Sequence, residues 1–96
     1  MTRVGRVENR ISKVEGFRVR IKHLDGLDVR SDRAGMPPWP YDRAAKDAWT
    51  VADWRRERFA RVYPGFEVDV LDRRRQPVAG QTRLGSVRTD YLNHRG

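Results

Sequence analysis

Residues 17–23 read FRVRIKH, and apolar and basic side chains alternate along this stretch. The apolar positions are Phe17, Val19 and Ile21, and the basic positions are Arg18, Arg20 and Lys22. A period of two places successive side chains on opposite faces of a β-strand. The stretch therefore predicts a strand with one face toward a core and a second face that carries positive charge.

Two glycine turns on either side of this strand predict a three-stranded meander over residues 4 to 31. Gly16 closes the first turn and Gly26 closes the second. If each glycine is left-handed in a three-residue loop, the register of the strands is set. In that register the apolar residues share one face: Val7, Ile11, Phe17, Val19, Ile21, Leu27 and Val29.

The same register arranges the charged residues of the other face in two rows. One row is Glu8, Lys22 and Asp28, which alternates in sign and neutralises itself. The other row is Arg10, Arg20 and Arg30, in which like charges lie opposite one another and are destabilising. Two interpretations remain open: the arginines extend into water, or an anion lies over Arg20.

The segment from 32 to 41 ends the meander, because it contains three prolines in four positions. Proline lacks a backbone donor and has a fixed φ, so neither a helix nor the interior of a sheet is expected there. Trp39 and Tyr41 then either pack over the sheet edge as a lid or present exposed rings to a partner.

Residues 51–62 predict the main helix. Thr50 is the expected N-cap, with Asp53 as the partner in an imperfect capping box, and Tyr63, Pro64 and Gly65 end the helix. Residues 42–48 are compatible with a short preceding helix. Arg55 and Arg58 fall within the apolar arc of the main helix. Either their stems lie along the core edge with solvated heads, or they form a partly buried anion site with nearby acidic or phosphate groups.

The last third of the chain predicts a strand, a basic turn and a short helix. Residues 66–71 alternate as a strand, residues 72–77 form a turn that carries Arg73, Arg74 and Arg75, and Val78 pairs back briefly. Helical spacing of Leu84, Val87 and Tyr91 follows, with Thr82 as the expected N-cap. The fold class is α+β: a small antiparallel sheet, one main helix packed on one face, and a short C-terminal helix.

Composition limits the classes of function. The chain has 96 residues, which predicts one domain, and a net charge of +8, which favours anionic partners. Lysine is scarce beside arginine, a bias that a GC-rich genome also produces. There is no cysteine, no membrane-length apolar run and no signal-peptide core, so we expect a cytoplasmic protein. His23 and His94 lack metal-ligand spacing, and no cofactor is expected.

Three functions are compatible with these features. The first is a non-catalytic nucleic-acid-binding module that contacts phosphates through the following residues: Arg10, Arg18, Arg20, Lys22, Arg30, Arg55, Arg58, Arg73, Arg74 and Arg75. The second is a module that binds an acidic or other protein surface through Trp39, Tyr41 and Trp54, residue types that dominate interface hot spots. The third is a small basic ribonuclease that uses His23. A dimer is compatible with each.

Overall fold

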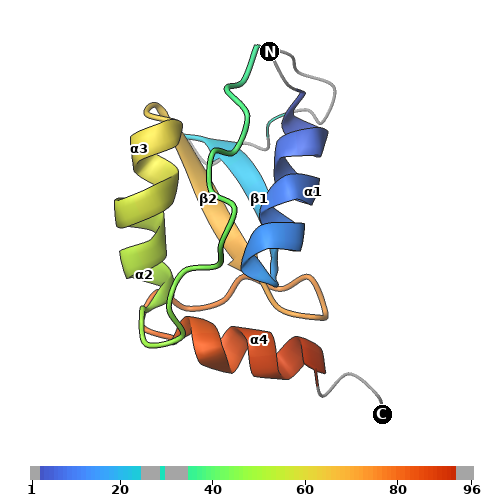
Figure 1. The fold of residues 1–96 in the computed structure, drawn as a ribbon, viewed down its shortest axis with the longest axis vertical. Helices are drawn as coiled ribbons and strands as arrows, with labels where there is room; N and C mark the ends of the chain where they lie inside the picture. Colours follow the sequence, from blue (N-terminus) through green and yellow to red (C-terminus); the bar gives the residue numbers. More distant parts are fainter. Residues whose placement is uncertain (1–2, 25–28, 30–34, 93–96) are drawn as a thin grey trace.

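The computed structural model describes residues 3–24, 29 and 35–92, and it has an α+β fold (Figure 1). Its elements, in chain order, are α1 (Val4–Glu15), β1 (Arg18–His23), α2 (Val51–Trp54), η1 (Arg55–Phe59), α3 (Ala60–Val62), β2 (Phe66–Leu71) and α4 (Leu84–Leu92). Strands β1 and β2 form a two-stranded antiparallel sheet. The α+β class is confirmed, whereas the three-stranded meander is wrong.

The meander is wrong because residues 4–15 form helix α1 instead of a strand. Val4, Val7 and Ile11 are buried, and their separations of three and four residues place them on one helical face. Gly16 does have the left-handed φ of 83° that a turn requires. Its N–H donates to the Ser12 carbonyl at 3.0 Å, so this glycine caps a helix and does not turn a hairpin.

Strand β1 has the predicted alternation. Phe17 just before the strand, Val19 and Ile21 are all buried. Across the sheet Val19 lies opposite Val70 and Ile21 opposite Val68, so the two strands bury the same face. On the other edge of β1, the Val29 N–H donates to the Ile21 carbonyl at 3.3 Å, the contact expected of a third strand. The turn at Gly26 and the residues Leu27, Asp28 and Arg30 lie outside the described residues.

The main helix spans residues 51–62, as predicted, and is composed of α2, η1 and α3 in direct succession. The Thr50 side chain accepts a hydrogen bond from the Asp53 N–H, and the Asp53 carboxylate accepts one from the Thr50 N–H, each at 3.1 Å. These two bonds complete the capping box and lower the pKa of Asp53. Within η1 the helix widens to a π-turn, because the Ala60 N–H bonds to the Arg55 carbonyl. Residues 42–48 are not helical.

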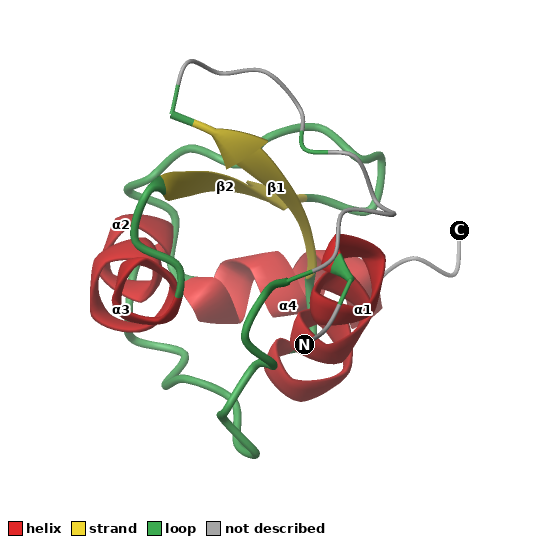
Figure 2. Cartoon of the chain, turned by 90° about the horizontal axis from the view of Figure 1, so that it is seen from above, coloured by secondary structure: helices red, strands yellow, loops and turns green. Residues whose placement is uncertain are grey.

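All the helices lie on the same side of the sheet (Figure 2). The extended segment 35–48 crosses that side between α1 and α3 in Figure 1. It carries Trp39 into the core, where its ring centroid is 5.7 Å from that of Trp54. The Tyr63 hydroxyl donates to the Pro37 carbonyl at 2.8 Å, and burial raises the pKa of Tyr63 to about 12. Of the two interpretations of this segment, the structure agrees with packed rings: Trp39 is buried in the core and Tyr41 is partly buried against it.

The C-terminal third agrees with its prediction. Strand β2 has the predicted bounds, Val78 donates its N–H to the Val70 carbonyl at 2.8 Å, and α4 buries Leu84 and Val87. The expected N-cap is wrong, because α4 begins at Leu84, two residues after Thr82, and the Thr82 carbonyl accepts a bond from the Val51 N–H. None of the helices in the described part of the chain is long and apolar enough to cross a membrane.

A candidate anion-binding hollow

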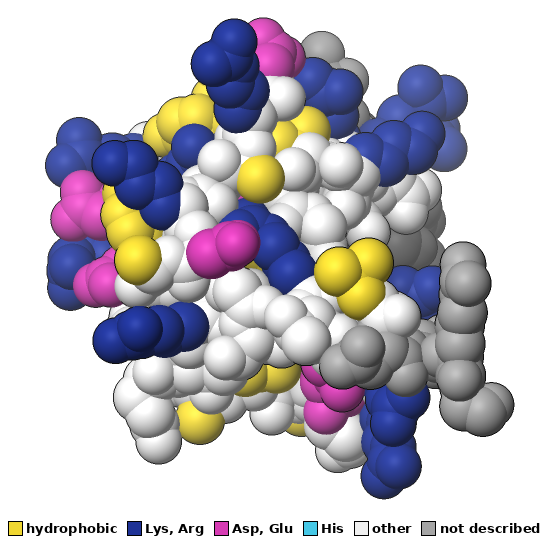
Figure 3. Space-filling model, turned by 60° about the horizontal axis from the view of Figure 1, so that its bottom comes forward, with side chains coloured by type: hydrophobic (Ala, Val, Ile, Leu, Met, Phe, Trp, Pro, Cys, Tyr) yellow, Lys and Arg dark blue, Asp and Glu magenta, His cyan; other side chains and the backbone are white. Residues whose placement is uncertain are grey.

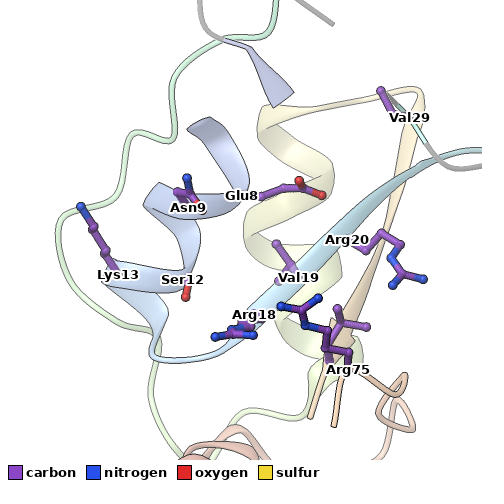
Figure 4. A pocket seen from close by; sticks show the side chains of 10 residues that line it. Glu8, Asn9, Ser12, Lys13, Arg18, Val19, Arg20, Val29 and Arg75 are labelled. Atoms are coloured by element: carbon purple, nitrogen blue, oxygen red, sulfur yellow. The ribbon is translucent and has the colours of Figure 1, made fainter. Parts of the chain in front are cut away.

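A hollow of 680 Å³ lies between α1, β1 and the turn that follows β2 (Figure 4). We call it the basic hollow. It is lined by Glu8, Asn9, Ser12, Lys13, Arg18, Val19, Arg20, Val29, Leu71 and Arg75. Four of these side chains are cationic and one is a carboxylate, so the lining has an excess of positive charge.

Strand β1 supplies Arg18 and Arg20 from its basic face. Arg20 lies opposite Asp69 in the strand register, and such a pair ordinarily forms a cross-strand ion pair. The Asp69 carboxylate is instead 2.7 Å from the ammonium group of Lys22. Among the described residues, the guanidinium groups of Arg18 and Arg20 form no ion pair, so both remain open to a ligand.

Helix α1 supplies Asn9, Ser12 and Lys13, three polar residues spaced so that they share one helical face. Sequence reasoning missed all three, because it assigned this segment to a strand. Glu8, the residue before Asn9 on the same helix, uses one carboxylate oxygen to accept the Ile21 N–H at 2.9 Å. That bond joins α1 to the outer edge of β1 and forms one wall of the hollow.

The turn after β2 supplies Arg75. The Asp72 carboxylate accepts the N–H groups of Arg74 at 2.8 Å and Gln76 at 2.9 Å, which holds the turn closed. Arg75 occupies the left-handed region with a φ of 62°. Its side chain lines the hollow beside Arg18, as Figure 4 shows.

Several arginines that the sequence analysis grouped with Arg20 lie elsewhere. Arg10 lies on α1 and pairs with Asp42 at 3.0 Å, so the predicted row through Arg10, Arg20 and Arg30 is wrong on its first member. Arg30 lies outside the described residues. Arg73 is 3.6 Å from Asp90, and its own N–H also donates to that carboxylate. Other predicted site residues that do not line the hollow are Lys22, Arg55, Arg58 and Arg74.

Arg58 belongs to a separate, buried group of charges that we call the Glu15 cluster: Glu15, Arg58 and Arg88. Glu15 is fully buried, and its carboxylate is 2.6 Å from Arg58 and 3.4 Å from Arg88. It also accepts the Ala45 N–H at 2.9 Å. Arg58 therefore does not extend a solvated head into water: its guanidinium pairs with a carboxylate of the same chain, Glu15.

Arg88 donates to protein groups in several directions. Its Nε donates to the Glu15 carbonyl at 2.5 Å, and one Nη donates both to the Ala45 carbonyl at 2.8 Å and to Asp47. Arg58 donates to the Arg43 carbonyl at 2.7 Å and lies 4.2 Å above the Tyr41 ring. These guanidinium groups already have partners, so the Glu15 cluster holds the fold together and does not offer a binding site.

The aromatic anchors proposed for a protein interface are mostly buried. Trp39 is 4% exposed and Trp54 is fully buried, so neither can serve as a surface hot spot in this conformation. Tyr41 is half-buried beneath Arg58. His23 is half-buried against Phe66, with ring centroids 5.9 Å apart, and it does not line the basic hollow. His94 lies outside the described residues.

The chemistry of the hollow suits anion binding. Guanidinium groups match phosphate and carboxylate oxygens with paired hydrogen bonds, and the Asn9 amide and Ser12 hydroxyl add neutral donors. Residues 3–24, 29 and 35–92 contain no group of three histidine or acidic side chains that could hold a metal ion.

The Tyr91 hydroxyl of α4 holds one end of β1 in place. It accepts a hydrogen bond from the Arg18 N–H at 3.1 Å. Burial raises the pKa of that hydroxyl.

The basic hollow differs from the surface on the side of α4. On the face drawn in Figure 3, basic side chains are dispersed and acidic or neutral groups separate them. Comparisons of the chain with protein-family models, with curated proteins and with solved structures found no match.

Proposed function

We propose that the protein is a non-catalytic module that binds the phosphate backbone of nucleic acid in the basic hollow. The observation that carries this proposal is that four cationic residues from α1, β1 and the 72–77 turn line one hollow: Lys13, Arg18, Arg20 and Arg75. No described acidic side chain pairs with any of them. A nucleic-acid phosphate would supply the missing negative charge.

The lining of the hollow favours binding over catalysis, because it offers no histidine and its carboxylate already has a partner. Its one carboxylate, Glu8, is engaged with the backbone of β1. His23, the residue on which a ribonuclease mechanism would depend, lies outside the lining. Contacts to phosphates position a protein on nucleic acid but read little sequence, so we expect weak sequence preference.

The experiment is a fluorescence anisotropy titration with fluorescein-labelled 20-nucleotide single-stranded RNA, single-stranded DNA and duplex DNA. Salt is varied from 50 to 300 mM, because neutralised phosphates release counterions. The expected slope of log K against log salt is about −0.9 per phosphate for duplex DNA and about −0.7 for a single strand. Binding that ignores salt, or no binding at 50 mM salt, contradicts the proposal.

Paired variants locate the contact. Arg18→Ala and Arg20→Ala together should remove about two phosphate contacts and reduce the magnitude of the slope accordingly. Arg6→Ala with Arg61→Ala is the matched control, because both are exposed arginines that do not line the hollow and the net charge falls equally. An equal loss of affinity in both pairs would show that the interaction depends on net charge alone.

A further inference from the structure

The two sides of the basic hollow differ in charge (Figure 4). Strand β1 and the 72–77 turn contribute Arg18, Arg20 and Arg75 to one side, which therefore carries three positive charges. We call this side the arginine wall. Guanidinium groups pair with phosphate oxygens, so the arginine wall is the side that suits the phosphates of a nucleic acid.

Helix α1 forms the other side of the hollow, and its formal charges cancel. It contributes one acidic residue, Glu8, one basic residue, Lys13, and the uncharged side chains of Asn9 and Ser12. We call this side the neutral wall. Because the arginine wall already supplies the cations that phosphates need, the neutral wall is suited to an uncharged part of the same ligand.

The side chains of Asn9 and Ser12 are available to such a group. Among the described residues, neither side chain forms a hydrogen bond with another group. Asn9 is exposed, whereas Ser12 is half-buried at the side of the hollow. An amide and a hydroxyl both donate and accept hydrogen bonds. A ligand hydroxyl can use both capacities, whereas a phosphodiester can only accept.

The remainder of the lining is apolar and contains no aromatic ring. It consists of Val19, Val29 and Leu71, which are all buried. Proteins that bind single strands ordinarily stack the bases on aromatic side chains, and the described lining of the hollow offers none. In a duplex the bases already stack on one another and the backbone is presented, so the hollow is better suited to a duplex.

RNA is the duplex whose backbone offers both kinds of group. Each ribose carries a 2′-hydroxyl that donates and accepts, and this hydroxyl is absent from DNA. Proteins recognise double-stranded RNA mostly through its shape, its phosphates and its 2′-hydroxyls, with little reading of sequence. A wall of arginines beside a wall of neutral donors and acceptors matches that pair of backbone groups.

We propose that the ligand of the basic hollow is double-stranded RNA. Arg18, Arg20 and Arg75 contact phosphates of one strand, and Asn9 and Ser12 contact a 2′-hydroxyl of the same strand. This inference rests on the nucleic-acid function proposed above and narrows its substrate class. It retains the weak sequence preference, because every ribose carries the same hydroxyl.

The first test compares three fluorescein-labelled 20-base-pair duplexes of one sequence: RNA, DNA, and RNA in which every 2′-hydroxyl is methylated. Anisotropy at 100 mM salt should give a Kd about tenfold lower for the RNA duplex than for the DNA duplex, as expected for one or two hydrogen bonds. The methylated duplex keeps its phosphates but its 2′-oxygen cannot donate, so it should bind as weakly as DNA. Equal affinity for RNA and DNA, or undiminished binding of the methylated duplex, overturns the proposal.

Paired variants locate the hydroxyl contact. Asn9→Ala with Ser12→Ala leaves the net charge unchanged, and it should raise the Kd of the RNA duplex about tenfold without changing that of the DNA duplex. Gln81→Ala with Ser86→Ala is the matched control, because it also removes one amide and one hydroxyl, at exposed positions that do not line the hollow. Loss of RNA affinity in both pairs, or in neither pair, overturns the proposal.

Failure of this inference can be distinguished from failure of the proposed function. If RNA and DNA duplexes bind equally and both lose affinity in the Arg18→Ala and Arg20→Ala pair, phosphate binding stands and the hydroxyl contact is overturned. If single-stranded RNA of the same sequence binds more tightly than the RNA duplex, phosphate binding stands and the double-stranded ligand is overturned. If none of these nucleic acids binds at 50 mM salt, both proposals are overturned.

Discussion

The Glu15 cluster and the basic hollow both contain arginines, but they use them in opposite ways. In the cluster, Arg58 and Arg88 surround one fully buried carboxylate and donate to backbone carbonyls as well. In the hollow, Arg18 and Arg20 form no ion pair with the described residues, and Asp69, which lies opposite Arg20 in the strand register, is bound by Lys22. The comparison teaches that a count of arginines says little about function until the partners of each one are known.

The physical basis of the difference is solvation. A buried ion pair must replace the water that both ions lose, and removing one partner leaves an uncompensated charge in the interior. An arginine at the surface keeps its water and contributes little to stability. Substitutions in the Glu15 cluster should therefore lower stability without changing ligand affinity. Substitutions in the basic hollow should lower ligand affinity without changing stability.

The largest expected effect is that of Glu15→Ala. The substitution leaves Arg58 and Arg88 without their shared carboxylate and leaves the Ala45 N–H without its acceptor. We expect a loss of about 3–5 kcal/mol in the free energy of unfolding, measured by urea denaturation. Glu67→Ala, at an exposed position, is the control and should change stability by less than about 0.5 kcal/mol.

Arg88→Lys should have the next largest effect. A lysine keeps the charge but cannot donate simultaneously to the Glu15 carbonyl, the Ala45 carbonyl and Asp47 as the guanidinium does. We expect destabilisation of about 2 kcal/mol by the same measurement. Unchanged stability would mean that charge alone, and not the fork of donors, holds the cluster together.

Tyr91→Phe should have a smaller effect on both properties. The Tyr91 hydroxyl donates to the Leu71 carbonyl and accepts the Arg18 N–H, so it links α4 to the base of the hollow. We expect a loss of about 1 kcal/mol in stability together with weaker RNA binding. If this variant binds RNA as tightly as the wild-type protein does, the contact between Tyr91 and β1 does not contribute to RNA binding.

The smallest effect on stability should be that of Arg20→Ala. Because its guanidinium has no ion-pair partner among the described residues, we expect a change within about 0.5 kcal/mol. The thermal midpoint in the presence of saturating RNA should rise less than for the unmodified protein, since bound ligand stabilises only the folded state. A large loss of stability without RNA would place Arg20 in a structural role and break the comparison.

The sequence predicted the second half of the fold better than the first. Thr50 and Asp53 specify their capping box locally, and Phe66–Leu71 alternates within a single strand, so neither depends on distant residues. Residues 4–15 were mistaken because Val7 and Ile11 are four apart, a separation that both a strand and a helix place on one face. Val4, three residues before Val7, is consistent only with the helix.

The candidate site was predictable only in part for the same reason. The alternation along residues 17–23 predicted Arg18 and Arg20, and the turn at residues 72–77 predicted Arg75. Both are local signals, and all three residues line the hollow. Asn9, Ser12 and Lys13 depend on the helical nature of α1. No local signal in the sequence identifies Glu15 as the partner of Arg58 and Arg88, because these contacts join residues 43 and 73 positions apart.

The length of those contacts also bears on how the chain reaches its fold during synthesis. Helix α1 and Glu15 are made before Arg88, which follows 73 residues later, in α4. The two strands of the sheet are likewise separated by the whole main helix. Contacts between distant residues slow folding, because the loop entropy is lost before the contact forms. Until α4 leaves the ribosome, the Glu15 carboxylate lacks one of its two cations, so we expect the native core to close only after α4 has emerged.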